Sequence, residues 1–74
     1  MAQVSNNEIQ RQAKFFIANL QGHIQNQLPL THRVAQSTAN RAFHFLMKYG
    51  NRIPLHLKRA LDIAIQEFKN YYSV

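Results

Sequence analysis

Six polar and basic residues share one face of a helical segment near the middle of the chain. Their positions follow the three-to-four-residue repeat of a helix face, with one adjacent pair at Asn40 and Arg41: Arg33, Ser37, Asn40, Arg41, His44 and Lys48. Arginine offers a fork of donors, lysine a point charge, and asparagine and serine directional hydrogen bonds, and this donor set suits phosphate oxygens. No Asp or Glu interrupts the face. The pattern predicts a surface that binds nucleic acid, without distinguishing DNA from RNA.

The segment from Ala35 to Ala42 resembles the opening of the recognition helix in helix-turn-helix DNA-binding domains. The resemblance covers only this stretch, AQSTANRA. That family also has a short preceding helix and a tight turn that contains glycine. Neither has a counterpart here, because helical periodicity already begins at Arg33. We therefore expect these residues to belong to a longer helix in another arrangement.

Histidines are the residues in this chain that most suggest metal binding or catalysis. The four histidines, His23, His32, His44 and His56, are 9, 12 and 12 positions apart, so no two share the i,i+4 spacing of a helical metal site. The chain has no cysteine and only three acidic residues to act as further ligands. It also lacks a glycine-rich phosphate loop, a nucleophile-elbow serine motif and a zinc-protease motif. We expect no metal, no cofactor and no enzymatic activity.

Three helices must position the basic face, and local signals place their ends. Ser5 and Glu8 form a capping-box pattern, and Thr31 can cap a second helix. Gly50 suits the position just after that helix, and Pro54 suits the first turn of a third. The expected helices span residues 6–27, 32–49 and 54–72.

Each expected helix carries an apolar stripe, so we predict an all-α, compact three-helix bundle. The first stripe is Ile9, Ala13, Phe16, Ile17, Leu20 and Ile24. The second is Ala35, Thr38, Ala39, Ala42, Phe45, Leu46 and Tyr49. The third is Leu57, Ala60, Leu61, Ala64, Phe68 and Tyr71, flanked by Ile65 and Tyr72. Residues 1–74 are expected to form one helical domain, with residues 1–4 disordered.

Several small or apolar residues fall outside these stripes and predict a protein interface: Phe15, Ala18, Gly22, Leu55 and Ile63. A chain of 74 residues without a disulfide or a metal gains stability from apolar burial in a partner. We therefore expect a homodimer, with Phe15, Ala18 and Gly22 as its first candidate contact. Gly22 lies inside the first expected helix, where glycine is less favourable than alanine. It therefore indicates either close packing at this position or a helix that is weak toward its end.

The overall charge narrows the class of partner. Nine Lys and Arg against three acids give a net charge of +6, which favours nucleic acid or an acidic protein surface. The alternative function is accordingly a small inhibitor or adaptor, of the kind found among viral or microbial accessory proteins, that docks on an acidic protein. No apolar segment is long enough for a signal core or a membrane span, so we expect a cytoplasmic protein without membrane insertion.

Overall fold

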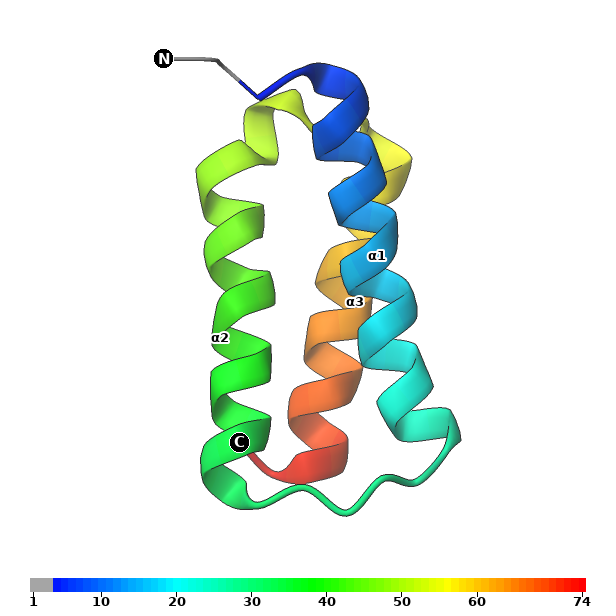
Figure 1. Ribbon diagram of the computed structural model, residues 1–74, viewed down its shortest axis with the longest axis vertical. Coiled ribbons are helices and arrows are strands. Elements are labelled where there is room, and N and C mark those ends of the chain that lie inside the picture. The colour runs from blue at the N-terminus through cyan, green and yellow to red at the C-terminus, as the bar shows by residue number, and fades with distance from the viewer. Residues whose placement is uncertain (1–3) are drawn as a thin grey trace.

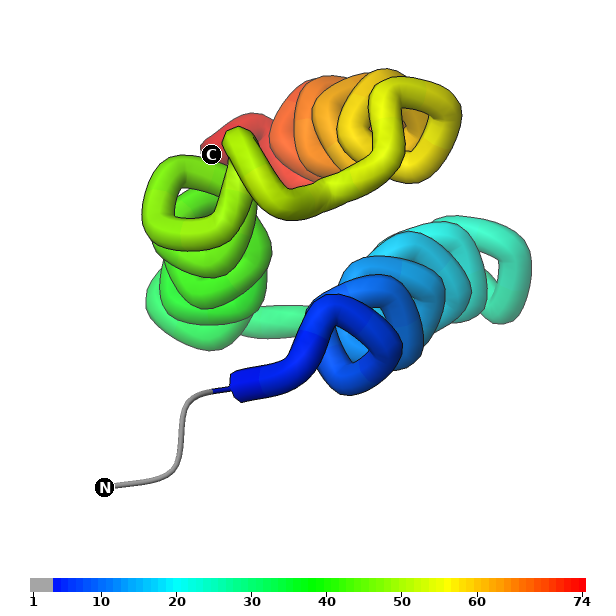
Figure 2. Tube along the Cα trace, turned by 90° about the horizontal axis from the view of Figure 1, so that it is seen from above, coloured from blue at the N-terminus to red at the C-terminus, as the bar shows by residue number. Residues whose placement is uncertain are grey.

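The structure, a computed structural model, describes residues 4–74 and contains three long helices. They are α1 (Asn6–Gln25), α2 (His32–Tyr49) and α3 (Leu55–Tyr72), and a short 3₁₀ turn, η1 (Gly50–Arg52), directly follows α2. The helices lie side by side (Figure 1) and occupy the corners of a triangle when viewed from above (Figure 2). The predicted all-α three-helix bundle is confirmed. Residues 1–3, which include most of the segment predicted to be disordered, lie outside the described residues.

The buried core follows the predicted apolar stripes closely. Its members are Ile9, Ala13, Leu20, Ala35, Ala39, Ala42, Phe45, Leu46, Ile53, Leu57, Leu61, Ala64, Ile65 and Phe68. The prediction for α3 was wrong at its edge: Tyr71 is exposed, whereas Ile65 and Tyr72 turn inward. Ile53 is also buried, although it lies in the connection between α2 and α3. Helical spacing therefore located almost the entire core.

α3 is the helix against which the other two pack. α1 and α2 each contact α3 more extensively than they contact each other. Leu61 and Phe68 of α3 are completely buried between them. α2 faces the core with Ala35, Ala39 and Ala42, whose small side chains allow a close approach. This arrangement leaves α1 and α2 partly separated along the side opposite α3.

The helix starts use the side-chain caps that the sequence predicts. The Ser5 hydroxyl accepts from the Glu8 amide at 3.1 Å, and the Thr31 hydroxyl accepts from the Val34 amide at 3.2 Å. The predicted return bond from Glu8 to Ser5 is absent. The Glu8 carboxylate instead accepts from Arg11, at 2.9 Å from Nε, and from Gln12 at 3.1 Å. In a complete capping box the Glu8 carboxylate would accept from the Ser5 amide, and here the ion pair with Arg11 takes the place of that hydrogen bond.

The helix ends differ from prediction by one or two residues. α1 ends at Gln25 rather than residue 27, because Gln27 adopts a left-handed conformation with φ of 50°. The amides of Gln27 and Leu28 then donate to the carbonyls of Ile24 and His23, which closes the helix. Gly50 is not a left-handed cap: its φ of −52° continues the chain into η1. Pro54 caps α3 instead of occupying its first position.

Two polar side chains from the α2–α3 hairpin hold the two ends of α1. Arg52 donates to the Val4 carbonyl at 2.6 Å and to the Asn6 side chain at 3.1 Å. At the other end, the Tyr72 hydroxyl lies 2.8 Å from the Leu28 carbonyl and 3.1 Å from the His23 carbonyl. Burial, with a smaller contribution from Tyr71, raises the pKa of Tyr72, so this hydroxyl keeps its proton as a donor.

Gly22 does not mark a site of close packing within the chain. A Cβ atom built on it would meet no heavy atom within 4 Å. Of the two explanations that the sequence left open, close packing between helices of the bundle is therefore wrong.

Leu61→Ala should destabilise the fold by about 2–5 kcal/mol, because it empties a fully buried position between three helices. A loss of this size is comparable to the whole stability of so small a domain. Thermal and urea unfolding followed by circular dichroism would measure it. An unchanged midpoint would show that α3 does not pack as described.

Gly22→Ala should stabilise the protein by about 1 kcal/mol, because alanine favours a helix interior and its methyl group meets open space here. The measurement is the urea midpoint at low protein concentration. Destabilisation at low concentration would show that Gly22 packs closely inside the bundle. Destabilisation that appears only at high concentration would indicate that a partner chain approaches Gly22 closely, as the sequence-based interface prediction requires.

Glu8 should give the stability a pH dependence below pH 4.5. Hydrogen bonds from Arg11 and then Gln12 lower the pKa of Glu8 from 4.5 to about 2 in the folded chain. The stabilisation is complete above pH 4.5 and is lost as the pH falls toward 2, because the unfolded chain takes up the proton first. Glu8→Gln should therefore be less stable than the natural chain at neutral pH, and this difference should shrink in acid. A difference that stays constant down to pH 2 would contradict this role.

Candidate functional site

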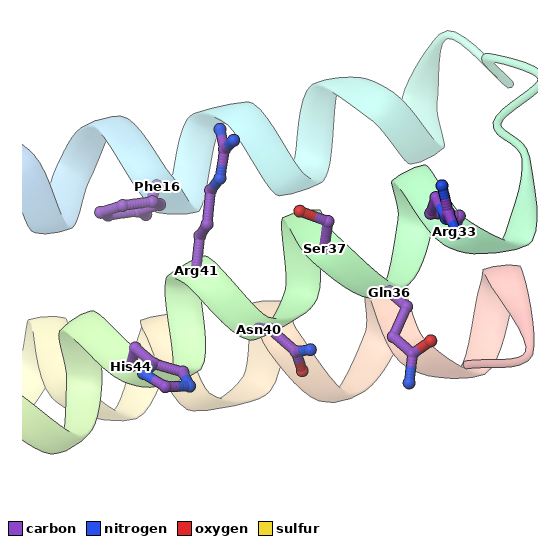
Figure 3. A pocket seen from close by; sticks show the side chains of 7 residues that line it. All are labelled: Phe16, Arg33, Gln36, Ser37, Asn40, Arg41 and His44. Atoms are coloured by element: carbon purple, nitrogen blue, oxygen red, sulfur yellow. The ribbon is translucent and has the colours of Figure 1, made fainter.

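A groove of about 620 Å³ lies between α1 and α2, on the side of the bundle away from α3 (Figure 3). α1 contributes Phe16, and α2 contributes all the remaining lining residues: Arg33, Gln36, Ser37, Asn40, Arg41 and His44. Five of the six residues predicted to bind nucleic acid therefore line one concave surface. The groove exists because α1 and α2 pack mainly on α3 and less on each other.

The lining residues divide into two rows along α2. Arg41 and Ser37 point from α2 toward α1, and the Arg41 guanidinium reaches across the groove beside Phe16 (Figure 3). Gln36, Asn40 and His44 lie along the outer side of the helix and point away from α1 (Figure 3). An extended anion that runs along α2 would thus meet Arg41 and Ser37 on the side toward α1, and amides and an imidazole on the outer side.

Phe16 forms the apolar part of the groove. Its ring centroid lies 5.0 Å from that of buried Phe45, so the ring is held by packing between α1 and α2. Phe15 packs edge-on against Phe16 with centroids 6.0 Å apart, and it is 61% exposed. An aromatic surface therefore continues from the groove onto the outer face of α1.

The polar groups of the groove are not used inside the described chain. No hydrogen bond or ion pair joins the side chains of Arg33, Ser37, Asn40, Arg41 or His44 to another group in residues 4–74. Two other cations of the chain are engaged: Arg11 binds Glu8, and Arg52 binds the start of α1. The donors of the groove are exposed to solvent and free to bind a ligand.

The acidic residues of the chain all lie away from the groove. Glu8 is at the start of α1 and pairs with Arg11, whereas Asp62 and Glu67 are on α3. Asp62 lines a hollow between α2 and α3, and Glu67 lines one between α1 and α3. No carboxylate lines the groove, so the field of Arg33 and Arg41 is not neutralised by an adjacent acid.

Lys48 is the one predicted phosphate-binding residue that the groove does not include. Its ammonium lies 5.3 Å from the centre of the Tyr49 ring, in the last turn of α2. It borders a neighbouring hollow with Phe43, His44 and Met47. Lys48 can extend the basic surface beyond His44 but does not line the groove.

The residues predicted to form a protein interface are separated by the fold. Phe15, Ala18 and Gly22 lie on α1, whereas Leu55 and Ile63 lie on α3. Phe15, Leu55 and Ile63 are all more than half exposed. Phe15 borders a hollow with Arg11, Gln12 and Phe16, and Leu55 borders a different one beside α2. The structure therefore does not join these predicted contacts into one patch.

The sequence analysis missed several residues of these surfaces. It assigned Phe16 to the core stripe alone, although a ring at the stripe's edge can also face a groove. Phe43 and Met47 are 47% and 69% exposed, and they were not singled out at all. Their i,i+4 spacing beside the core stripe of α2, between that stripe and the basic face, is the signal that would have found them.

Within residues 4–74 no three His, Asp or Glu side chains gather into a group that could hold a metal ion. His23 is tied locally, with its Nδ1 2.6 Å from the Asn19 carbonyl. In this same part of the chain, none of the helices has the length and apolarity required to span a bilayer. The arrangement is suited to binding an anion in the groove.

Comparison with known proteins adds no further assignment. The chain matched no protein-family model, no curated protein and no solved structure.

Proposed function

We propose that this protein is a non-catalytic module that binds nucleic acid through the groove between α1 and α2. Arg33 and Arg41 bind phosphates, and Lys48 extends the contact along α2. Ser37, Asn40 and His44 add hydrogen bonds to phosphate, sugar or base edges. The observation that carries the proposal is a concave surface that has free cationic and polar donors and no acidic residue.

The acid-free lining favours phosphate over most other ligands. A metabolite pocket is usually an enclosed cavity, whereas this groove is an open surface with polar side chains along it. Nucleic acid presents phosphates at regular intervals, so it can engage Arg33 and Arg41 together, two helical turns apart. The short chain and the small number of cations fit modest, salt-sensitive affinity.

An acidic protein is the second candidate partner, and the exposed ring of Phe15 beside the groove favours it. Aromatic residues often supply much of the binding energy in protein interfaces. In that case charge would mainly accelerate association, and the apolar contact of Phe15 would hold the complex together. The protein would then act as a small inhibitor or adaptor, and its affinity for nucleic acid would be weak.

Arg41→Glu should weaken binding to nucleic acid across all sequences, because it places a carboxylate beside Phe16 at the centre of the groove. Three fixed cations predict a log–log salt slope of about −3 on duplex DNA, and the variant should lose about one unit of that slope. Stability should change by no more than about 0.5 kcal/mol, because the side chain is exposed. Fluorescence anisotropy with single-stranded and duplex probes at several salt concentrations measures both effects.

Lys14→Glu is the matched control for this experiment. It changes the net charge of the chain equally, but it lies roughly 200° around α1 from Phe16 and so faces away from the groove. Its affinity should fall much less than that of Arg41→Glu. Equal losses would indicate that net charge alone drives binding, and undetectable binding by the natural chain at low salt would refute the proposal in favour of a protein partner.

A further inference from the structure

A second surface lies between α2 and α3 and adjoins the end of the groove near His44 and Lys48. Three large apolar side chains, Phe43, Met47 and Leu55, border a hollow of about 440 Å³ and are each roughly half or more exposed. Three charged residues, Lys58, Arg59 and Asp62, stand at the same hollow. We call this surface the α2–α3 face. It shares no lining residue with the groove.

The second half of α2 is apolar on more than one side. Phe45 and Leu46 are buried in the bundle, while Phe43 and Met47 face outward at i,i+4 spacing. A helix at a free surface normally shows one apolar stripe and a polar opposite face. Apolar side chains on a second side are typical of a helix that is also covered by a partner.

The charges on this face suit a second copy of the same chain. Arg59 and Asp62 are three positions apart on α3, yet no ion pair joins them within the described residues, where Arg11–Glu8 is the one pair formed. A surface with both signs on one helix is complementary to its own copy when the two helices run antiparallel. A two-fold axis that crosses the exposed side of α3, at the level between residues 60 and 61, places Arg59 of each copy opposite the partner's Asp62.

We propose that the α2–α3 face binds a second copy of this chain, with antiparallel α3 helices and two reciprocal Arg59–Asp62 pairs. Phe43, Met47 and Leu55 supply the apolar burial, and the charges fix the register. This replaces Phe15, Ala18 and Gly22 as the contact in the expected homodimer. A nucleic acid would not favour this face, because Asp62 opposes phosphate and the apolar side chains offer it no hydrogen bonds.

Dimerisation by this face leaves most of the groove open. Phe43 and Met47 share a hollow with His44 and Lys48, so the partner would lie beside that end of the groove. The remaining lining residues on α2, which are Arg33, Gln36, Ser37, Asn40 and Arg41, do not line the α2–α3 face. A dimer would present two such sites together, which would strengthen nucleic-acid binding.

Sedimentation of the full chain from micromolar to millimolar concentration tests the proposal. The natural chain should dimerise within this range, and Met47→Glu should weaken the dimer at least about tenfold by burying a charge in the apolar contact. Met47 is exposed in the single chain, so circular dichroism should show unchanged helicity. A natural chain that stays monomeric over the whole range would overturn the proposal.

Exchanging the charges of Arg59 and Asp62 tests whether these two residues face each other across the proposed dimer. Arg59→Glu should weaken the dimer because it opposes the partner's Asp62 with a like charge, and Arg59→Glu/Asp62→Arg should restore it. Phe15→Glu is the matched control and should leave the dimer unchanged. Failure of the double variant to recover, or dissociation by Phe15→Glu in place of Met47→Glu, would contradict the proposed face.

Discussion

Burial of α3 against both other helices is the constraint from which the rest of the structure follows. Leu61 and Phe68 are fully enclosed, and α1 and α2 each pack mainly on α3. Two helices that share a third as their principal partner need not close on each other, so a groove remains between α1 and α2. Arg52 and Tyr72, which flank or end α3, also hold the two ends of α1. The groove is therefore a consequence of the way in which α1 and α2 both pack mainly on α3.

The fold separates charged residues by role. Arg11 and Arg52 are used to fix the start of α1, whereas Arg33 and Arg41 make no internal bond in the described chain. The groove carries one sign of charge, which suits a polyanion, and the α2–α3 face carries both signs, which suits a second copy. The groove and the α2–α3 face have no lining residue in common, and they adjoin at the hollow that His44 and Lys48 share with Phe43 and Met47.

The sequence predicted much of this structure because helical periodicity and side-chain caps are local signals. The three helices, the caps at Ser5 and Thr31 and nearly all of the core were expected, as were five of the groove-lining residues. It did not predict the left-handed Gln27, because glutamine gives no signal for that conformation. The contacts of Arg52 and Tyr72 join residues more than forty positions apart, so only the tertiary arrangement reveals them. The role of Phe16 in the groove was missed for the same reason.

The central claim, that nucleic acid binds in the groove between α1 and α2, is tested most directly by NMR. An ¹⁵N-labelled sample would be titrated with a short random-sequence oligonucleotide, and the amide and side-chain shifts would be mapped onto the structure. Binding in the groove predicts the largest changes at Arg33, Ser37, Asn40, Arg41 and His44, with smaller changes around Phe16 and few on the outer face of α3. Changes concentrated on α3, or none at low salt, would contradict it.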